Sequence, residues 1–145
     1  MFRVTRRYQF AASHRLHAPR LSAEENRRIY GKCNHPYGHG HNYVLEVSAR
    51  GPLDEATGCA VNLAELDELV DRQVMAAFAH RNLNREVEAF AGEIVPTSEN
   101  LGLEICRRLK AHWRETFPNN LPELEKVRIA ETARNIFEIE ADEIE

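Results

Sequence analysis

The sequence predicts an α+β fold in which a four-stranded antiparallel sheet carries two helices on one face. Two stretches near the N-terminus alternate apolar and polar residues, two central stretches repeat apolar residues every three or four positions, and two stretches near the C-terminus alternate again. The predicted order is therefore ββααββ, and the economical arrangement packs both helices on the apolar face of one sheet. The 145 residues contain no repeat or linker, so we expect a single domain over residues 1–145.

The first two strands are predicted from rows of residues two apart. In residues 2–16 the even positions are largely apolar, and His14 lies near the end of that row. Residues 21–32 could hold a short helix within a long loop, and loops of that length are often functional. The second strand begins with two histidines that lead into an apolar row: His39, His41, Tyr43, Leu45, Val47 and Ala49.

Two helices are predicted in the middle of the chain. The first begins at Asn62, which suits a capping box with Glu65, and the second begins near Thr97 or Ser98 as the cap residue. The apolar stripe of the first helix is Leu63, Leu66, Val70, Val74, Ala77 and Phe78. The stripe of the second is Leu101, Ile105, Leu109 and Trp113.

The last two strands are predicted on either side of a tight turn at residues 133–135. In the first of them, Val127, Ile129 and Glu131 share one face, so a carboxylate continues an apolar row. Unpaired burial of a carboxylate is unfavourable, so Glu131 needs a partner. It can accept hydrogen bonds from the N–H groups of a ligand or form an ion pair at the rim, and its position alone leaves both open. The apolar row of the final strand is Phe137, Ile139 and Ala141.

Composition and charge argue against several classes of protein. The net charge is −4 and the arginine pairs are scattered, which disfavours a nucleic-acid surface. The apolar stretches are too short to cross a bilayer, and the N-terminal segment alternates instead of forming a signal core. Three cysteines without a CxxC pair indicate a reducing compartment, with Cys59 and Cys106 as packing residues. We therefore expect a cytoplasmic protein that binds neither nucleic acid nor membrane.

Three histidines are predicted to meet on one face of the sheet. His39 and His41 are two residues apart in a strand and point the same way, and His14 lies on the apolar face of the other strand. Three neutral imidazoles with one open position are typical of a catalytic zinc site. The alternative is that they are ordinary loop or core histidines, and the HxH spacing with a third histidine on the same face favours the metal.

The roles of the other reactive side chains stay open at this level. Cys33 is a candidate base or nucleophile, a fourth zinc ligand, or an inert thiol. His80, just after the first helix, is ambiguous on its own. His17 and His35 are expected to be solvated loop residues.

Six segments, taken in order along nearly the whole chain, carry a resemblance to a known family: ASHRL, YGKCNHPYGHGHNY, GCAVNLAEL, HRNLN, PTSEN and ETARN. Together they resemble the 6-pyruvoyltetrahydropterin synthase family, which includes the 6-carboxytetrahydropterin synthases. The resemblance implies a tunnelling fold and a homohexamer, built as a dimer of trimers with active sites at subunit interfaces. It also implies that Zn2+ is bound by His14, His39 and His41.

The resemblance also implies the reaction and the remaining roles. The substrate would be 7,8-dihydroneopterin triphosphate, and the product 6-pyruvoyltetrahydropterin, with loss of triphosphate. Cys33 would be the general base, with His80 from a neighbouring subunit as its relay partner. Glu131 would anchor the pterin and take part in the relay, and Thr97 and Ser98 would line the pterin pocket. No glycine-rich motif suggests a nicotinamide cofactor.

Three alternatives accompany this interpretation. The five residues between Cys33 and the HGH block resemble the biopterin-type enzymes, whereas the queuosine-pathway 6-carboxytetrahydropterin synthases usually have a shorter gap. The family usually reads Asp-His where this chain has Ala79-His80, so the chain could also be a zinc- and pterin-binding protein with weakened catalysis. A third interpretation takes His39, His41 and Glu46 as the metal triplet of an all-β cupin barrel, and the two helical stripes argue against it.

Overall fold

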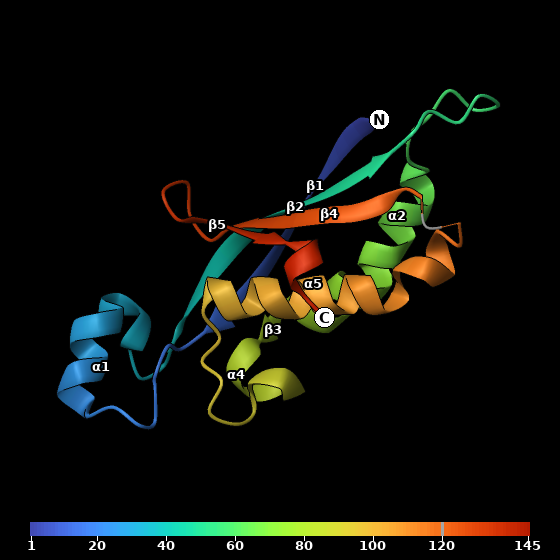
Figure 1. The fold of residues 1–145 in the computed structure, drawn as a ribbon. Coiled ribbons are helices and arrows are strands. Elements are labelled where there is room, and N and C mark those ends of the chain that lie inside the picture. Colours follow the sequence, from blue (N-terminus) through green and yellow to red (C-terminus); the bar gives the residue numbers. More distant parts are fainter. Residues whose placement is uncertain (120) are drawn as a thin grey trace.

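The structure is a computed structural model that describes residues 1–119 and 121–145. Its strands form one sheet in the order β3-β1-β2-β4-β5 (Figure 1), in which β3 runs parallel to β1 and the other neighbours are antiparallel. The strands are β1 Phe2–His14, β2 His39–Gly51, β3 Arg81–Asn82, β4 Glu123–Ala130 and β5 Ile136–Glu140. The helices are α1 Ala23–Tyr30, α2 Leu63–Val70, α3 Ala76–Phe78, α4 Leu83–Glu86 and α5 Ser98–Thr116.

The predicted α+β class and the ββααββ order are confirmed, with one correction to the sheet. Within the described residues the sheet has five strands, because Arg81 and Asn82 pair with Ala12 and Ser13 at the edge of β1. This strand is too short to show an alternating pattern, so periodicity could not reveal it. The expected short helix between the first two strands is α1.

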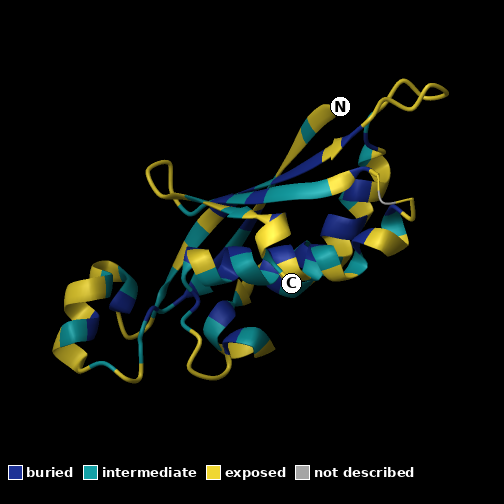
Figure 2. Ribbon diagram, in the orientation of Figure 1, coloured by how far each residue is buried: buried dark blue, intermediate teal, exposed yellow. Residues whose placement is uncertain are grey.

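Two helical segments form one layer on the same face of the sheet (Figure 1). The first is α2, which continues through a π-helical turn, Asp71–Met75, into α3, and the second is α5. Figure 2 shows that burial is concentrated along the central strands and the inner sides of these helices. Removal of this apolar surface from water is the main stabilising term. The buried core includes Phe10, Tyr43, Leu45, Val47, Leu66, Phe78, Leu101, Ile105, Leu109, Val127 and Ile129.

The cap predictions fit the start of each helix. Thr97 caps α5, since its Oγ1 accepts from the Asn100 N–H at 3.1 Å. Asn62 caps α2 by accepting from the Glu65 N–H at 3.2 Å, which is one half of the predicted capping box. A glycine at position 102 lets α5 lie close to the sheet, because a Cβ there would overlap the Ile139 side chain.

The segment between β1 and β2 extends past the end of the sheet, away from the helical layer (Figure 1). Two buried asparagines hold it in place. Asn26 exchanges side-chain hydrogen bonds with the backbone of Ala18, and Asn34 donates to the Leu16 carbonyl at 2.7 Å. The Leu16 N–H in turn donates to the Cys33 carbonyl at 2.7 Å, so the loop has a fixed shape. In the described part of the chain, no helix is long and apolar enough to cross a membrane.

Candidate metal centre

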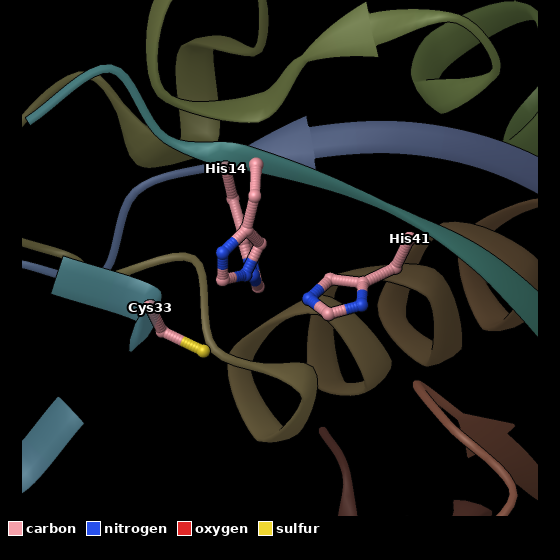
Figure 3. Close-up of side chains that lie close together, drawn as sticks. His14, Cys33 and His41 are labelled. Carbon is pink, nitrogen blue, oxygen red and sulfur yellow. The ribbon is translucent and has the colours of Figure 1, made fainter. Parts of the chain in front are cut away.

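Strand register brings the three histidines together. In the antiparallel pairing of β1 with β2, His14 lies opposite His39 and Ala12 lies opposite His41. All three imidazoles point to the face that carries the core, beyond its last apolar residues. Their rings are near neighbours, with centroids 5.2 Å apart for His14 and His39 and 4.6 Å apart for His39 and His41. Figure 3 shows Cys33 directing its sulfur toward the same point from the loop.

The donor atoms of this cluster fit a metal ion. One ligand atom from each of His14, Cys33, His39 and His41 lies within 4.8 Å of the others. The Nε2 atoms of the three histidines are buried and have no hydrogen-bond partner in the protein. A buried polar atom without a partner costs about 1–3 kcal/mol, so three together call for a ligand that accepts their lone pairs. Two or three imidazole nitrogens with a thiolate are typical ligands of transition metals.

The surroundings of His14 keep it neutral and fix its tautomer. Its Nδ1 lies 2.9 Å from the carbonyl oxygen of Pro96, which can only accept, so Nδ1 carries the hydrogen and Nε2 keeps its lone pair. The hydroxyl of Tyr43 lies 3.2 Å from the same Nδ1. Burial lowers the pKa of His14 to about 4 and also lowers the pKa of His41. Neutral imidazoles whose Nε2 lone pairs have no other partner are the form that binds a metal.

Cys33 lies in a 3₁₀ turn, Gly31–Asn34, and is half-buried. Burial, and to a smaller extent the charge of Glu131, raises the pKa of the Cys33 thiol. The protein alone therefore holds Cys33 as a thiol. A positive charge within the cluster is needed to populate the thiolate.

Glu131 follows β4 directly and reaches the same cluster. Its Oε1 lies 3.4 Å from Nε2 of His41 and 3.6 Å from Nε2 of His14, and its side chain is 11% exposed. In the described part of the chain it forms no ion pair with lysine or arginine. Its carboxylate thus points at the histidine nitrogens, which makes the rim ion pair the less fitting of the two earlier interpretations.

The start of α5 lies beside the cluster through Pro96. Thr97 is used as the cap of the helix, whereas Ser98 is 3% exposed and its Oγ has no hydrogen-bond partner in the protein. Both residues directly follow Pro96, whose carbonyl contacts His14, and Ser98 has a polar atom without a partner.

His80 is not part of the cluster within one chain. It is exposed, has φ = 61°, and donates its N–H to the Ala11 carbonyl at 2.6 Å. It lines a hollow of about 530 Å³ at the edge of β1, which is also lined by Ser13, Asn42 and His41 of the cluster.

The structure agrees with some of the remaining sequence expectations and contradicts others. Cys106 is buried as expected, but Cys59 is exposed, because it lies in the loop after β2 and not in a packed element. His35 is exposed, while His17 is half-buried and lies 3.1 Å from the Asn34 amide nitrogen. Glu46 pairs with Arg7 and Arg128 on the face opposite the histidines, which removes it as a metal ligand.

Sequence reasoning missed two residues that support the cluster, Tyr43 and Pro96. Tyr43 continues the row of His39 and His41, but its place in an apolar row predicts only a core residue. The position of the Pro96 carbonyl depends on how the loop before α5 folds, and no local pattern reports that.

The sequence profile described as 6-pyruvoyl tetrahydropterin synthase matches residues 3–142. The chain belongs to this family. It is 44% identical over 133 residues to the 6-pyruvoyl tetrahydrobiopterin synthase of Poecilia reticulata, which covers 92% of this chain and 86% of the relative. The solved 6-pyruvoyl tetrahydropterin synthase of Caenorhabditis elegans superposes with a TM-score of 0.86 at 39% identity, over 96% of this chain and 94% of that one. A putative 6-carboxy-5,6,7,8-tetrahydropterin synthase of Archaeoglobus fulgidus is 34% identical over 101 residues, 70% of this chain and 74% of the relative.

Proposed function

We propose that this protein is a zinc-dependent carbon–oxygen lyase that converts 7,8-dihydroneopterin triphosphate to 6-pyruvoyltetrahydropterin and releases triphosphate. The observation that carries the proposal is the meeting of three partnerless histidine nitrogens with Cys33 and Glu131. The family and its biopterin-type relatives support the pyruvoyl product over the carboxy product.

The residues of the cluster suit the steps of this reaction. His14, His39 and His41 would hold Zn2+, which supplies a Lewis acid for the oxygens of the substrate's side chain. Cys33 would remove protons from the side-chain carbons as general base, because the charge of the cation offsets the burial that raises its pKa. The C–O bond to triphosphate breaks with its electron pair on the leaving group. The pterin ring takes up the hydrogens that the side chain gives up, so no external reductant is needed.

The pterin ring would be held by the residues on the other side of the cluster. The Glu131 carboxylate can accept two hydrogen bonds from the amino and ring N–H groups of the pterin. Thr97 and Ser98 would line the pocket, and the free Oγ of Ser98 is available for a further bond. In this arrangement Glu131 also completes the relay that returns protons to the ring.

Assembly would bring His80 to the site. We propose a homohexamer, a dimer of trimers, in which His80 of a neighbouring subunit acts as the relay partner of Cys33. Two sheet edges support assembly: within the described residues, β1 pairs with β3 only at its last residues, and β5 has no neighbour on its outer side. Two different free edges on one chain suit head-to-tail pairing that closes into a ring.

A product assay tests the proposal. Zinc-loaded protein is incubated with 7,8-dihydroneopterin triphosphate without oxygen, and the pterin products are identified by mass spectrometry. We expect 6-pyruvoyltetrahydropterin from the unmodified chain and none from His39→Ala or Cys33→Ala. A 6-carboxy product with acetaldehyde would assign the protein to the queuosine-pathway reaction instead. If the protein binds zinc and the pterin but leaves the substrate unchanged, it is a binding protein, and the replacement of the family's usual aspartate by Ala79 would explain the lost catalysis.

A further inference from the structure

A hollow of about 640 Å³ opens beside His39, where α1 and the turn after it approach the start of β2. It shares His39 with the histidine cluster, so whatever fills it adjoins the candidate metal centre. Within the part of the chain that the structure describes, no aspartate or glutamate lines it, although the whole chain has a net charge of −4. The basic side chains that line it are Arg15, His17, Arg27, Lys32, His35 and His39.

The cations of this basic hollow are held by the loop but are not neutralised by it. Arg15 follows β1 directly, and its Nε donates to the Asn34 carbonyl at 3.2 Å, which leaves its terminal guanidinium nitrogens for another acceptor. Arg27 lies in the last turn of α1, and Lys32 lies in the turn that follows. In the described chain, none of the three forms an ion pair with a carboxylate.

Three unpaired cations on a fixed loop are complementary to a ligand with several negative charges. A guanidinium presents its N–H donors in a planar fork that matches two phosphate oxygens, and an ammonium adds a mobile point charge. The buried amide of Asn34 and its backbone partners hold this loop in shape, so little ordering is required when an anion binds.

We propose that the basic hollow binds the triphosphate group of the substrate, an inference that rests on the proposed function. In 7,8-dihydroneopterin triphosphate, the phosphates are attached to the terminal carbon of the side chain, which follows the two hydroxyl-bearing carbons. A substrate whose hydroxyls lie at the histidines and whose ring lies at Glu131 must therefore place its phosphates next to the cluster. The basic hollow adjoins the cluster at His39, and the same cations would stabilise the charge of the leaving triphosphate.

A simpler explanation of Arg27 is that it only stabilises the end of α1, and Arg28 provides a matched control for this. Cations in the last turn of a helix interact favourably with its dipole, and Arg27 and Arg28 both lie in the last turn of α1. Both are exposed, and only Arg27 lines the basic hollow. If Arg27 served only the helix, then Arg27→Gln and Arg28→Gln would have the same consequences.

The test compares two ligands that differ only in the phosphates. Equilibrium binding of 7,8-dihydroneopterin triphosphate and of 7,8-dihydroneopterin is measured without oxygen on zinc-loaded Cys33→Ala protein, a background chosen to prevent turnover. We expect the triphosphate to bind more tightly, and Arg27→Gln to reduce this advantage roughly tenfold, with roughly a hundredfold reduction when Lys32→Gln is added. Arg28→Gln should leave the advantage unchanged. The unphosphorylated ligand should bind equally to all variants, which controls for folding, zinc and the pterin pocket.

The outcomes test the triphosphate site independently of the proposed lyase reaction. Equal phosphate advantages in Arg27→Gln and Arg28→Gln, or no advantage at all, would overturn the basic hollow as the triphosphate site even if the unmodified protein forms the pyruvoyl product. A loss of advantage in Arg27→Gln alone would support it even if no product forms. Weaker binding of free inorganic triphosphate by Arg27→Gln, with the advantage of the pterin ligand unchanged, would mean that the hollow serves another anion and would reject the assignment.

Discussion

The same two strand rows behave differently at their two ends. Toward the middle of the sheet, residues such as Tyr43, Leu45 and Val47 have no exposed surface and pack beneath the helices. Toward the end of the sheet, the rows continue on the same face as histidines, and their Nε2 atoms are buried without partners. One end of the rows contributes to stability, whereas the other holds unsatisfied groups that a ligand must complete. Prolonging a core row with histidines would attach the proposed metal site to a rigid scaffold.

The largest effect is expected from removing a ligand at the histidine end. His39→Ala should abolish zinc binding under dialysis conditions and, with it, product formation. It should leave the unfolding temperature of the metal-free protein unchanged or slightly raised, because it removes a buried nitrogen that has no partner. Elemental analysis and thermal unfolding of the metal-free protein measure both. Retention of one zinc per chain by His39→Ala would remove this histidine from the metal site.

The opposite result is expected at the apolar end of the same row. Leu45 has no exposed surface, so Leu45→Ala should lower the free energy of unfolding by about 2–5 kcal/mol through lost burial and a cavity. Zinc stoichiometry should remain one per chain at temperatures where the variant is folded. Denaturant unfolding with and without metal distinguishes the two ends. Loss of zinc from folded Leu45→Ala would show that the two ends are not separable.

These two ends also differ in how well the sequence predicts them. The period-two rows fix which side chains share a face, so the positions of His14, His39 and His41 follow from the pattern together with the antiparallel neighbours. Cys33 lies in a short 3₁₀ turn and Glu131 directly after β4, so neither belongs to a periodic row. Their approach to the histidines depends on the Leu16–Cys33 backbone bond and on the turn after β4. Side-chain and backbone contacts far apart in the sequence set those loops, and no local periodicity records them.

A smaller effect is expected from a substitution of Tyr43, which contacts both the apolar core and the histidine cluster. Its ring packs in the core and its hydroxyl lies 3.2 Å from Nδ1 of His14. Tyr43→Phe keeps the ring and removes the hydroxyl, so zinc affinity should fall about tenfold, in the range usual for groups that orient a metal ligand. Competition with a zinc chelator measures the affinity, and thermal unfolding of the metal-free protein serves as the control. Unchanged affinity would leave Pro96 as the group that orients His14.

The smallest effect is expected at Ala79, which lies at the β1 edge of the sheet just before β3. Ala79 caps the C-terminus of α3 and is half-buried against the core, and it precedes the exposed His80. Ala79→Asp would place a carboxylate next to that imidazole, which should make it more basic and raise turnover severalfold if His80 relays protons for Cys33. Turnover is measured per zinc-loaded, folded chain, since an acidic group at a half-buried position also lowers stability.

The control for this result is a Glu86→Gln variant, which tests whether Glu86 already assists His80. Glu86 lines the same hollow as His80, and its Oε2 accepts from the Asn82 N–H at 2.6 Å while its Oε1 lies 4.0 Å from Arg81. If Glu86 already serves as the carboxylate for His80, Glu86→Gln should lower turnover and Ala79→Asp should restore it in the double variant. If Glu86→Gln has no effect and Ala79→Asp alone raises turnover, the natural chain works with an unassisted histidine. A fall in turnover in Ala79→Asp with zinc and fold intact would mean that His80 has no relay role that a carboxylate can strengthen.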